Sequence, residues 1–231
     1  MRPSAAGLAA LCILALSLLL PSPARLEATS YDQLELEVWC ELEPMIQESD
    51  DYPLSGEAAR KRVLEEARTL LSAMIYGVQF SYTPPDALRR QAEQFRLTPL
   101  AELAWGDPRL RIAEAEVRDA RLYARVRYDL QDFQAARRRA WQSNAVPTAA
   151  GNGQASLFAA TAPEGKRRSL EEAFKEAIRN HLRPVLFNKP REVRGELLLW
   201  QPPRVVVDAG AYLTAAVVKL RVQEIRAYSF F

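Results

Sequence analysis

The sequence predicts an α+β domain in which a mostly antiparallel sheet of about six to eight strands is covered by two long amphipathic helices. Residues 205–226 hold the densest run of β-branched and aromatic side chains, with the period-two alternation of strands. Residues 55–76 and 169–183 instead carry apolar side chains at helical spacing. Both kinds of pattern occur in one chain, which favours helices packed on a sheet.

The first 28 residues have the layout of a secretory signal peptide. An early positive charge, Arg2, precedes an uninterrupted apolar run over residues 8–20, and prolines and small residues follow. The run is shorter than the roughly 20 residues of a membrane-spanning helix, so an uncleaved anchor is the weaker alternative. We therefore expect an exported chain, periplasmic or secreted, with no membrane span after removal of the leader. Residues 29–231 are expected to form a single domain.

The composition excludes several classes of function. The chain has 31 basic and 29 acidic residues, a balance that does not favour a nucleic-acid partner. Removal of the leader would leave one cysteine, Cys40, and hence no intramolecular disulfide. His181 is the only histidine, which excludes two-histidine zinc sites and most imidazole-based hydrolases. We predict no catalytic residue, no metal site and no cofactor.

The first element after the leader is predicted to be a strand over residues 34–43. Leucines, Val38 and Cys40 alternate there with Trp39 and four glutamates. This pattern indicates a buried Cys40 and an acidic outer face on an edge strand, where like charges discourage strand addition by other chains.

A long helix is expected next, over residues 55–76. Ser55 can cap its N-terminus and Gly77 can end it. A short strand over residues 78–82 should follow directly, and Asp86 can start a minor helix that runs to residue 95.

The middle of the chain is predicted to be rich in strands. Residues 97–103 form a candidate strand, and residues 110–117 and 122–130 read as a hairpin. The apolar parity of the first arm changes after Ile112, so we expect a β-bulge between Ile112 and Ala113.

Residues 142–166 are small and polar, contain Pro and Gly, and lack periodicity, which predicts a flexible loop. Its Gly151-Asn152-Gly153 sequence lacks the flanking strand and helix of a phosphate-binding loop. Two basic clusters flank the loop and are the candidate binding residues, for an envelope protein or an anionic envelope component. These candidates are Arg137, Arg138, Arg139, Trp141, Lys166, Arg167 and Arg168.

The second long helix is predicted to begin at Ser169, with Glu172 at the capping-box position. A strand over residues 193–200 follows, in which Trp200 is the tryptophan most suited to an exposed contact. The C-terminal residues 205–226 are expected to fold into two strands joined at residues 208–210. The first half of the last strand is apolar on both faces and is predicted to lie inside the sheet.

These features favour a non-enzymatic binding or structural protein of the cell envelope or the secreted space. One alternative is a hydrolase of envelope glycans that uses two carboxylates, for which Glu65 and Glu66 are among the adjacent acidic pairs. It predicts a cleft where two acids converge. The other alternative is a carrier of a small apolar ligand, which predicts an apolar cavity between sheet and helices.

Overall fold

The computed structural model describes residues 32–43, 46, 52–159, 162–184 and 190–228. The predicted leader, residues 1–28, lies outside these ranges. The described residues form three helices and nine strands, and all their strand pairs are antiparallel, which confirms the predicted α+β class. In this described part of the chain, every helix is too short or too polar to cross a membrane.

The elements in chain order are β1 (Gln33–Glu41), α2 (Gly56–Ile75), β2 (Val78–Thr83), β3 (Gln94–Pro99), β4 (Leu110–Arg118), β5 (Arg121–Asp129), α3 (Asp132–Arg139), β6 (Thr148–Ser156), α4 (Ala162–Leu182), β7 (Glu192–Leu199), β8 (Arg204–Asp208) and β9 (Ala211–Arg226). Both predicted long helices are present, as α2 and α4. The structure adds α3 and β6, which the sequence patterns did not reveal.

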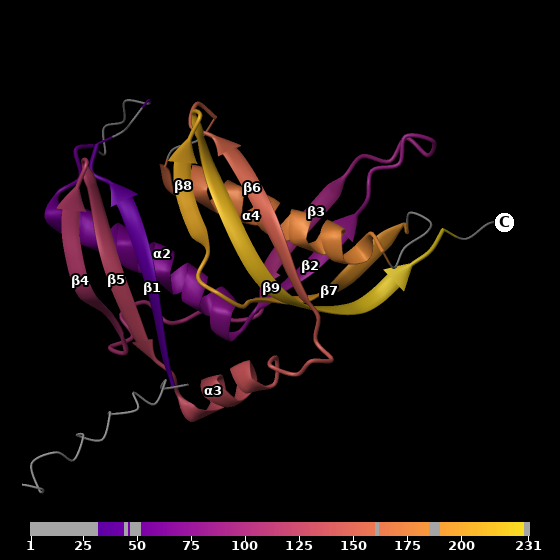
Figure 1. Cartoon of the computed structure of the whole chain (residues 1–231), viewed down its shortest axis with the longest axis horizontal. Coiled ribbons are helices and arrows are strands. Elements are labelled where there is room, and N and C mark those ends of the chain that lie inside the picture. Colours follow the sequence, from indigo (N-terminus) through magenta and orange to yellow (C-terminus); the bar gives the residue numbers. More distant parts are fainter. Residues whose placement is uncertain (1–31, 44–45, 47–51, 160–161, 185–189, 229–231) are drawn as a thin grey trace, which may run out of the picture. The chain divides into compact units, whose positions relative to one another are not determined.

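The strands form two sheets, where the sequence predicted one. The smaller sheet has the order β1-β5-β4, and the larger one has the order β3-β2-β7-β9-β6, with β8 also paired to β9. Helix α2 packs on β1 and β5 and reaches β7, whereas α4 lies against β6 and β9 (Figure 1). Alternation within a strand indicates which side chains share a face, but it does not specify the neighbouring strand, so the division into two sheets was not predictable from it.

The smaller sheet follows the sequence prediction closely. The β4–β5 hairpin has the expected bulge, with the register shift between Ile112 and Glu114. Strand β1 lies at the edge of the sheet as predicted, and its Glu35 carboxylate accepts from Arg127 Nε at 2.5 Å.

Helix α2 is capped as predicted. The Ser55 side chain accepts a hydrogen bond from the Ala58 N–H at 3.2 Å. Gly77 ends the helix with a φ of 84°, and a Cβ there would lie 2.7 Å from the carbonyl oxygen of Leu197. Only glycine combines that backbone angle with that close approach.

The segment between β2 and β3 differs from the prediction. The expected minor helix over residues 86–95 is absent, because the Asp86 carboxylate accepts the N–H groups of Leu88 and Arg89 and forms a turn. An isolated bridge joins Asp86 to Gln91, and β3 begins at Gln94 instead of residue 97.

The prediction of a flexible loop over residues 142–166 is wrong. Residues Thr148–Ser156 form strand β6 at the edge of the larger sheet, and α4 already begins at Ala162. Ser169 is therefore not a helix cap but a buried residue within α4. Its hydroxyl donates to the Lys166 carbonyl oxygen at 2.9 Å and lies 2.6 Å from the Thr214 hydroxyl.

Glycines explain why β6 lacks the side-chain pattern of a strand. A Cβ on Gly153 would overlap the Ser169 carbonyl oxygen, and a Cβ on Gly151 would overlap that of Ala173. The strand is thus pressed against the backbone of α4, which requires glycine instead of an apolar side chain. Helix α4 also covers the edge of β6, since the Glu176 carboxylate accepts the Asn152 N–H.

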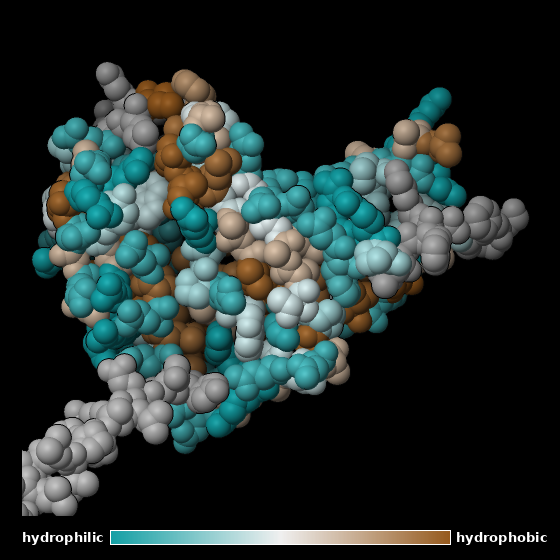
Figure 2. All heavy atoms as spheres, in the orientation of Figure 1, coloured by the Kyte–Doolittle hydropathy of each residue, from teal (hydrophilic) through white to brown (hydrophobic). Residues whose placement is uncertain are grey.

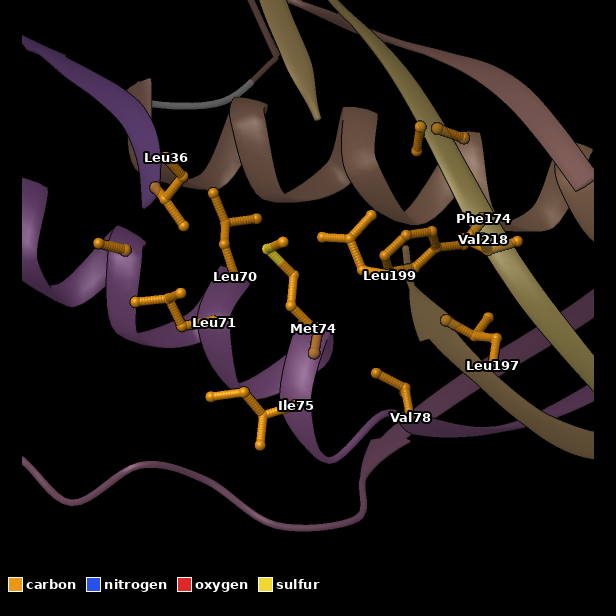
Figure 3. Close-up of a cluster of buried hydrophobic side chains, with 14 of the residues drawn as sticks. Leu36, Leu70, Leu71, Met74, Ile75, Val78, Phe174, Leu197, Leu199 and Val218 are labelled. Atoms are coloured by element: carbon orange, nitrogen blue, oxygen red, sulfur yellow. The ribbon is translucent and has the colours of Figure 1, made fainter. Parts of the chain in front are cut away.

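A single core joins both sheets and both long helices. Figure 3 shows Phe174 of α4 beside Val218 of β9, with Met74 of α2 between them and Leu71; Leu197 of β7 belongs to the same cluster. All these side chains are at most 2% exposed. The core runs along the length of α2 and packs against the C-terminal half of α4.

The C-terminal hairpin has the predicted turn, with Gly210 at a φ of 73° between β8 and β9. The first half of β9 lies inside the sheet as predicted, because residues 211–215 pair with both β6 and β8, but it is not buried on both faces. Its inner face is buried, but Ala215 is exposed and Leu213 is half-buried on the other face. Figure 2 shows apolar side chains gathered over β8 and its turn into β9. Val206, in the middle of β8, is 37% exposed.

Candidate functional site

The two predicted basic clusters do not come together. Arg137, Arg138 and Arg139 belong to α3, whereas Lys166 belongs to the start of α4, and β6 lies between these helices (Figure 1). Nine residues of strand span roughly 30 Å at about 3.3 Å per residue. The clusters therefore require separate interpretations.

Arg137 and Arg138 stabilise the end of α2. Arg137 Nη2 donates to the Tyr76 carbonyl oxygen at 2.7 Å, and Arg138 Nη1 donates to that of Met74 at 2.9 Å. Helix α2 has no basic residue in its own last turn, so α3 supplies the donors for carbonyl groups that a helix end leaves unpaired. Burial lowers the pKa of Arg138. Arg139, the third candidate, is the exposed last residue of α3.

Trp141 is not a surface contact residue, contrary to the prediction. It is 1% exposed and packs with Val146 and Leu198 in a small satellite core. The guanidinium of Arg221 stacks 4.0 Å from the centroid of its ring. Trp200 packs against the same cluster and is only half-buried.

The second cluster divides between a surface network and a cleft. Arg167 and Arg168 both pair with Glu164, with N–O distances of 2.7 Å for each pair. The two arginines are exposed on α4, where such pairs contribute little to stability. Lys166 points instead to the interior, and its side chain is only 6% exposed.

A cleft of about 320 Å³ lies between α2, α4 and the start of β8. It occupies the N-terminal half of α4 and the middle of α2, beside the region that the core fills. Its lining is mostly apolar, with a charged floor and rim, and includes Arg62, Glu66, Thr69, Lys166, Leu170 and Val205. The size is at the lower end of the range for small-molecule sites, which is about 300 to 1,000 Å³.

An ion pair between Lys166 and Glu66 forms the floor of the cleft. Lys166 Nζ lies 2.6 Å from Glu66 Oε2 and also donates to the carbonyl oxygen of Trp39. The ammonium sits 4.0 Å from the centroid of the Trp39 ring, and the indole N–H of Trp39 donates to the Val205 carbonyl oxygen at 3.3 Å. The pair thus connects β1, α2, α4 and β8.

Arg62 lies at another side of the cleft. Its Nη1 donates to the Tyr52 hydroxyl at 2.8 Å, and its guanidinium lies 5.4 Å from the centroid of that ring. Burial raises the pKa of Tyr52. Because the phenol of Tyr52 is neutral, it does not neutralise the positive charge of Arg62.

A second buried polar group, the Glu41 carboxyl, lies near the cleft. The Tyr212 hydroxyl donates to Glu41 Oε1 at 3.2 Å, and Glu41 is 3% exposed. Burial raises the pKa of Glu41, although the Tyr212 hydrogen bond and the charges of Arg121 and Lys166 oppose the shift. Burial and the Glu41 charge raise the pKa of Tyr212 in turn. The predicted acidic outer face of β1 therefore ends before Glu41.

The Glu41→Gln variant should gain stability relative to the wild type as the pH rises. A raised pKa in the folded state gives a stabilising contribution that is complete below the unfolded pKa, about 4.3, and is lost as pH rises through the folded pKa. Glutamine does not titrate and has no such loss. Urea unfolding at about pH 4 and about pH 8 measures the difference, with Glu37→Gln on the exposed face of β1 as the control. A stability difference that is the same at both pH values would contradict the prediction.

Cys40 and His181 take no part in the cleft lining. Cys40 is buried as predicted, its Sγ lies 3.6 Å from the Ala59 carbonyl oxygen, and burial raises the pKa of the thiol. His181 is half-buried near the end of α4. Among the described residues, no group of three or more His, Cys, Asp or Glu side chains is arranged to hold a metal ion.

Comparison with known proteins places the chain in a family. Residues 22–228, most of the chain, match the model of one family of unknown function. The chain belongs to that family. A protein of Treponema pallidum (strain Nichols), described as an uncharacterized protein, is 25% identical over 199 residues, which are 86% of this chain and 83% of that protein. No solved structure matches the chain.

The sequence singled out Lys166 and Arg167, which line the cleft, but it missed Arg62 and indicated Glu66 only as one member of several acidic pairs. Glu66 follows Glu65, and the pair reads as the solvated face of a helix. A polar residue in such a pattern gives no signal for a partner 100 residues away on α4. The i,i+4 spacing from Arg62 to Glu66 places both on one side of α2 and was the available clue.

Proposed function

We propose that this protein is an exported, non-enzymatic binding protein that holds a small ligand with an apolar body in the cleft between α2 and α4. The cleft carries this proposal. Leu70, Leu170 and Val205 provide apolar walls, and polar groups converge at one place on the floor, which is the usual composition of a small-molecule site. The leader-like residues 1–28 are the support for export.

The geometry favours binding over carboxylate-based hydrolysis. Glu65 and Glu66 both line the cleft, but Glu66 is held by Lys166, and Glu65 lies 4.0 Å from Lys61. The carboxyl whose pKa is raised, Glu41, is outside the cleft lining and is buried against Tyr212. A general acid needs access to substrate as well as a raised pKa, and the buried Glu41 lacks that access.

The geometry also argues against a partner site built on residues 142–166. Those residues form β6 and the start of α4, and β6 is covered by α4. The guanidinium groups of Arg137 and Arg138 donate hydrogen bonds to carbonyl oxygens at the end of α2. A small ligand in the cleft accounts better for the buried charge of Lys166 than an extended partner does.

Filling the cleft should abolish binding of an uncharged apolar probe. Thr69 is exposed at the cleft, so Thr69→Trp adds an indole there without disturbing the core. We expect the affinity for N-phenylnaphthylamine, followed by its fluorescence, to fall by about tenfold or more, because the indole occupies the space of the ligand. Arg60→Trp, on an exposed part of α2 outside the lining, is the matched control.

Two outcomes would reject the proposed site. One is binding of the probe by Thr69→Trp with the affinity of the wild type. The other is an equal loss of affinity in Arg60→Trp, which would place the effect outside the cleft. Circular dichroism of both variants establishes whether they retain the wild-type fold.

A further inference from the structure

We infer that the ligand carries an anionic oxygen group, which Lys166 receives at the floor of the cleft. This inference rests on the proposed function and specifies the chemistry of the ligand. The side chain of Lys166 is only 6% exposed, although a lysine ammonium is among the groups most costly to remove from water. A buried ammonium at the end of an apolar cleft is suited to an acidic head group.

Lys166 has capacity for a further acceptor. An ammonium has three N–H donors, and two oxygens accept from Lys166 in the structure, the Trp39 carbonyl oxygen and Glu66 Oε2. Glu66 is 23% exposed and belongs to the cleft lining, so the ion pair faces the bound ligand instead of the closed core. An oxygen anion at the floor would share the ammonium with Glu66.

The charges around the cleft favour an anion over a cation or a neutral head group. The lining holds the cations Arg62, Lys166 and Arg167 and the anions Glu65 and Glu66. Within the described residues Arg62 makes no ion pair, and its guanidinium donates to the Tyr52 hydroxyl. Its guanidinium therefore adds a positive charge that an incoming anion can use.

The apolar walls determine the rest of the ligand. Leu170 of α4 and Val205 of β8 line the cleft together with the side chain of Leu70 and with Pro163 in the first turn of α4. Burial of an alkyl or aryl body there provides affinity, while the ammonium orients the head group. The expected ligand is thus an amphipathic acid with a carboxylate, sulfate or phosphate head.

A series of ligands with one alkyl chain tests this inference on the wild-type protein. Decanoate, decyl sulfate, decyl phosphate, decanol and decyltrimethylammonium differ in their head groups and can be used below their micelle concentrations. Displacement of N-phenylnaphthylamine gives the affinities. We expect at least one of the three acids to bind about tenfold more tightly than decanol, and the cation to bind more weakly than decanol. The preferred acid identifies the head group.

Substitutions of the two residues at the floor of the cleft should change the affinity for the acid in opposite directions. Glu66→Gln keeps an acceptor for Lys166 but removes the competing negative charge, so we expect about a fivefold increase in affinity for the preferred acid. Circular dichroism of this variant excludes partial unfolding, which would expose additional apolar surface to the probe. Lys166→Met keeps an apolar stem but removes the ammonium, so the preference for the acid over decanol should disappear. Lys175→Met is the control, because Lys175 lies on α4 outside the cleft and pairs with Glu93 and Glu172.

The results separate this inference from the proposed function. Equal affinity for decanol and the acids, with no gain in Glu66→Gln, would overturn the anionic head group while the cleft remains a binding site. Failure of every compound and of the neutral probe to bind would overturn both. A head-group preference that survives Lys166→Met unchanged would reject Lys166 as the receiving group.

Discussion

Substitution of Gly153 by alanine should destabilise the protein by about 3 kcal/mol, because it forces apart a strand and a helix that touch through their backbones. The added Cβ would overlap the Ser169 carbonyl oxygen and would lie 2.9 Å from the Cβ of Glu172. Backbone atoms cannot move aside by a side-chain rotation, so α4 must shift away from β6. That shift would also loosen the inner face of β9, which α4 covers.

Gly56→Ala is the matched control for this substitution. Gly56 is the first residue of α2, and an added Cβ there meets no atom within 4 Å. The same chemical change should therefore leave stability unchanged or raise it by up to about 1 kcal/mol, because alanine restricts the unfolded chain. Urea unfolding of the two variants measures the contrast. Equal stabilities would show that the close contact between β6 and α4 is not required.

The second large effect is expected at Lys166. Lys166→Met should lower the free energy of unfolding by about 2 kcal/mol, because the Glu66 carboxylate and the Trp39 carbonyl oxygen lose their donor. The loss should be smaller than for a fully buried pair, since Glu66 is 23% exposed and water can reach it. Chemical unfolding in the absence of ligand gives the value.

The double variant Glu66→Met/Lys166→Met tests whether the loss of stability in Lys166→Met comes from the unpaired Glu66 carboxylate. It leaves no unpaired carboxylate, so it should recover most of the stability that the single lysine substitution removes. Lys175→Met serves again as the control on α4. If the double variant is as unstable as the sum of its single variants, the two residues are not energetically coupled, and the ion pair does not hold the floor of the cleft.

Local patterns were sufficient for most elements of the fold. Helix α2 has both a cap, Ser55, and a terminating glycine, Gly77, and the β4–β5 hairpin shows its bulge as a change of parity after Ile112. These features depend on residues a few positions apart, which sequence spacing reports directly. Strand β6 has no such pattern, because its contact with α4 requires the absence of side chains at Gly151 and Gly153.

The candidate site was only partly predictable for a related reason. Lys166 stood out as one of a run of three basic residues, yet the neighbouring Arg167 faces a surface network while Lys166 is buried. The run does not show which of its members turns inwards. Trp141 was misjudged in the same way, since a tryptophan next to arginines suits both a surface contact and the satellite core in which it lies.

By itself, the sequence determined the α+β class, the two long helices, the strand character of the C-terminal third and the burial of Cys40. These properties follow from periodicity along the chain, because apolar side chains must share one face of a helix or strand to leave water. Only the tertiary structure decided the division into two sheets, the strand at β6 and the meeting of Lys166 with Glu66. Each of these depends on contacts between residues far apart in the chain, whose specificity lies in the fit of packed elements and not in local spacing.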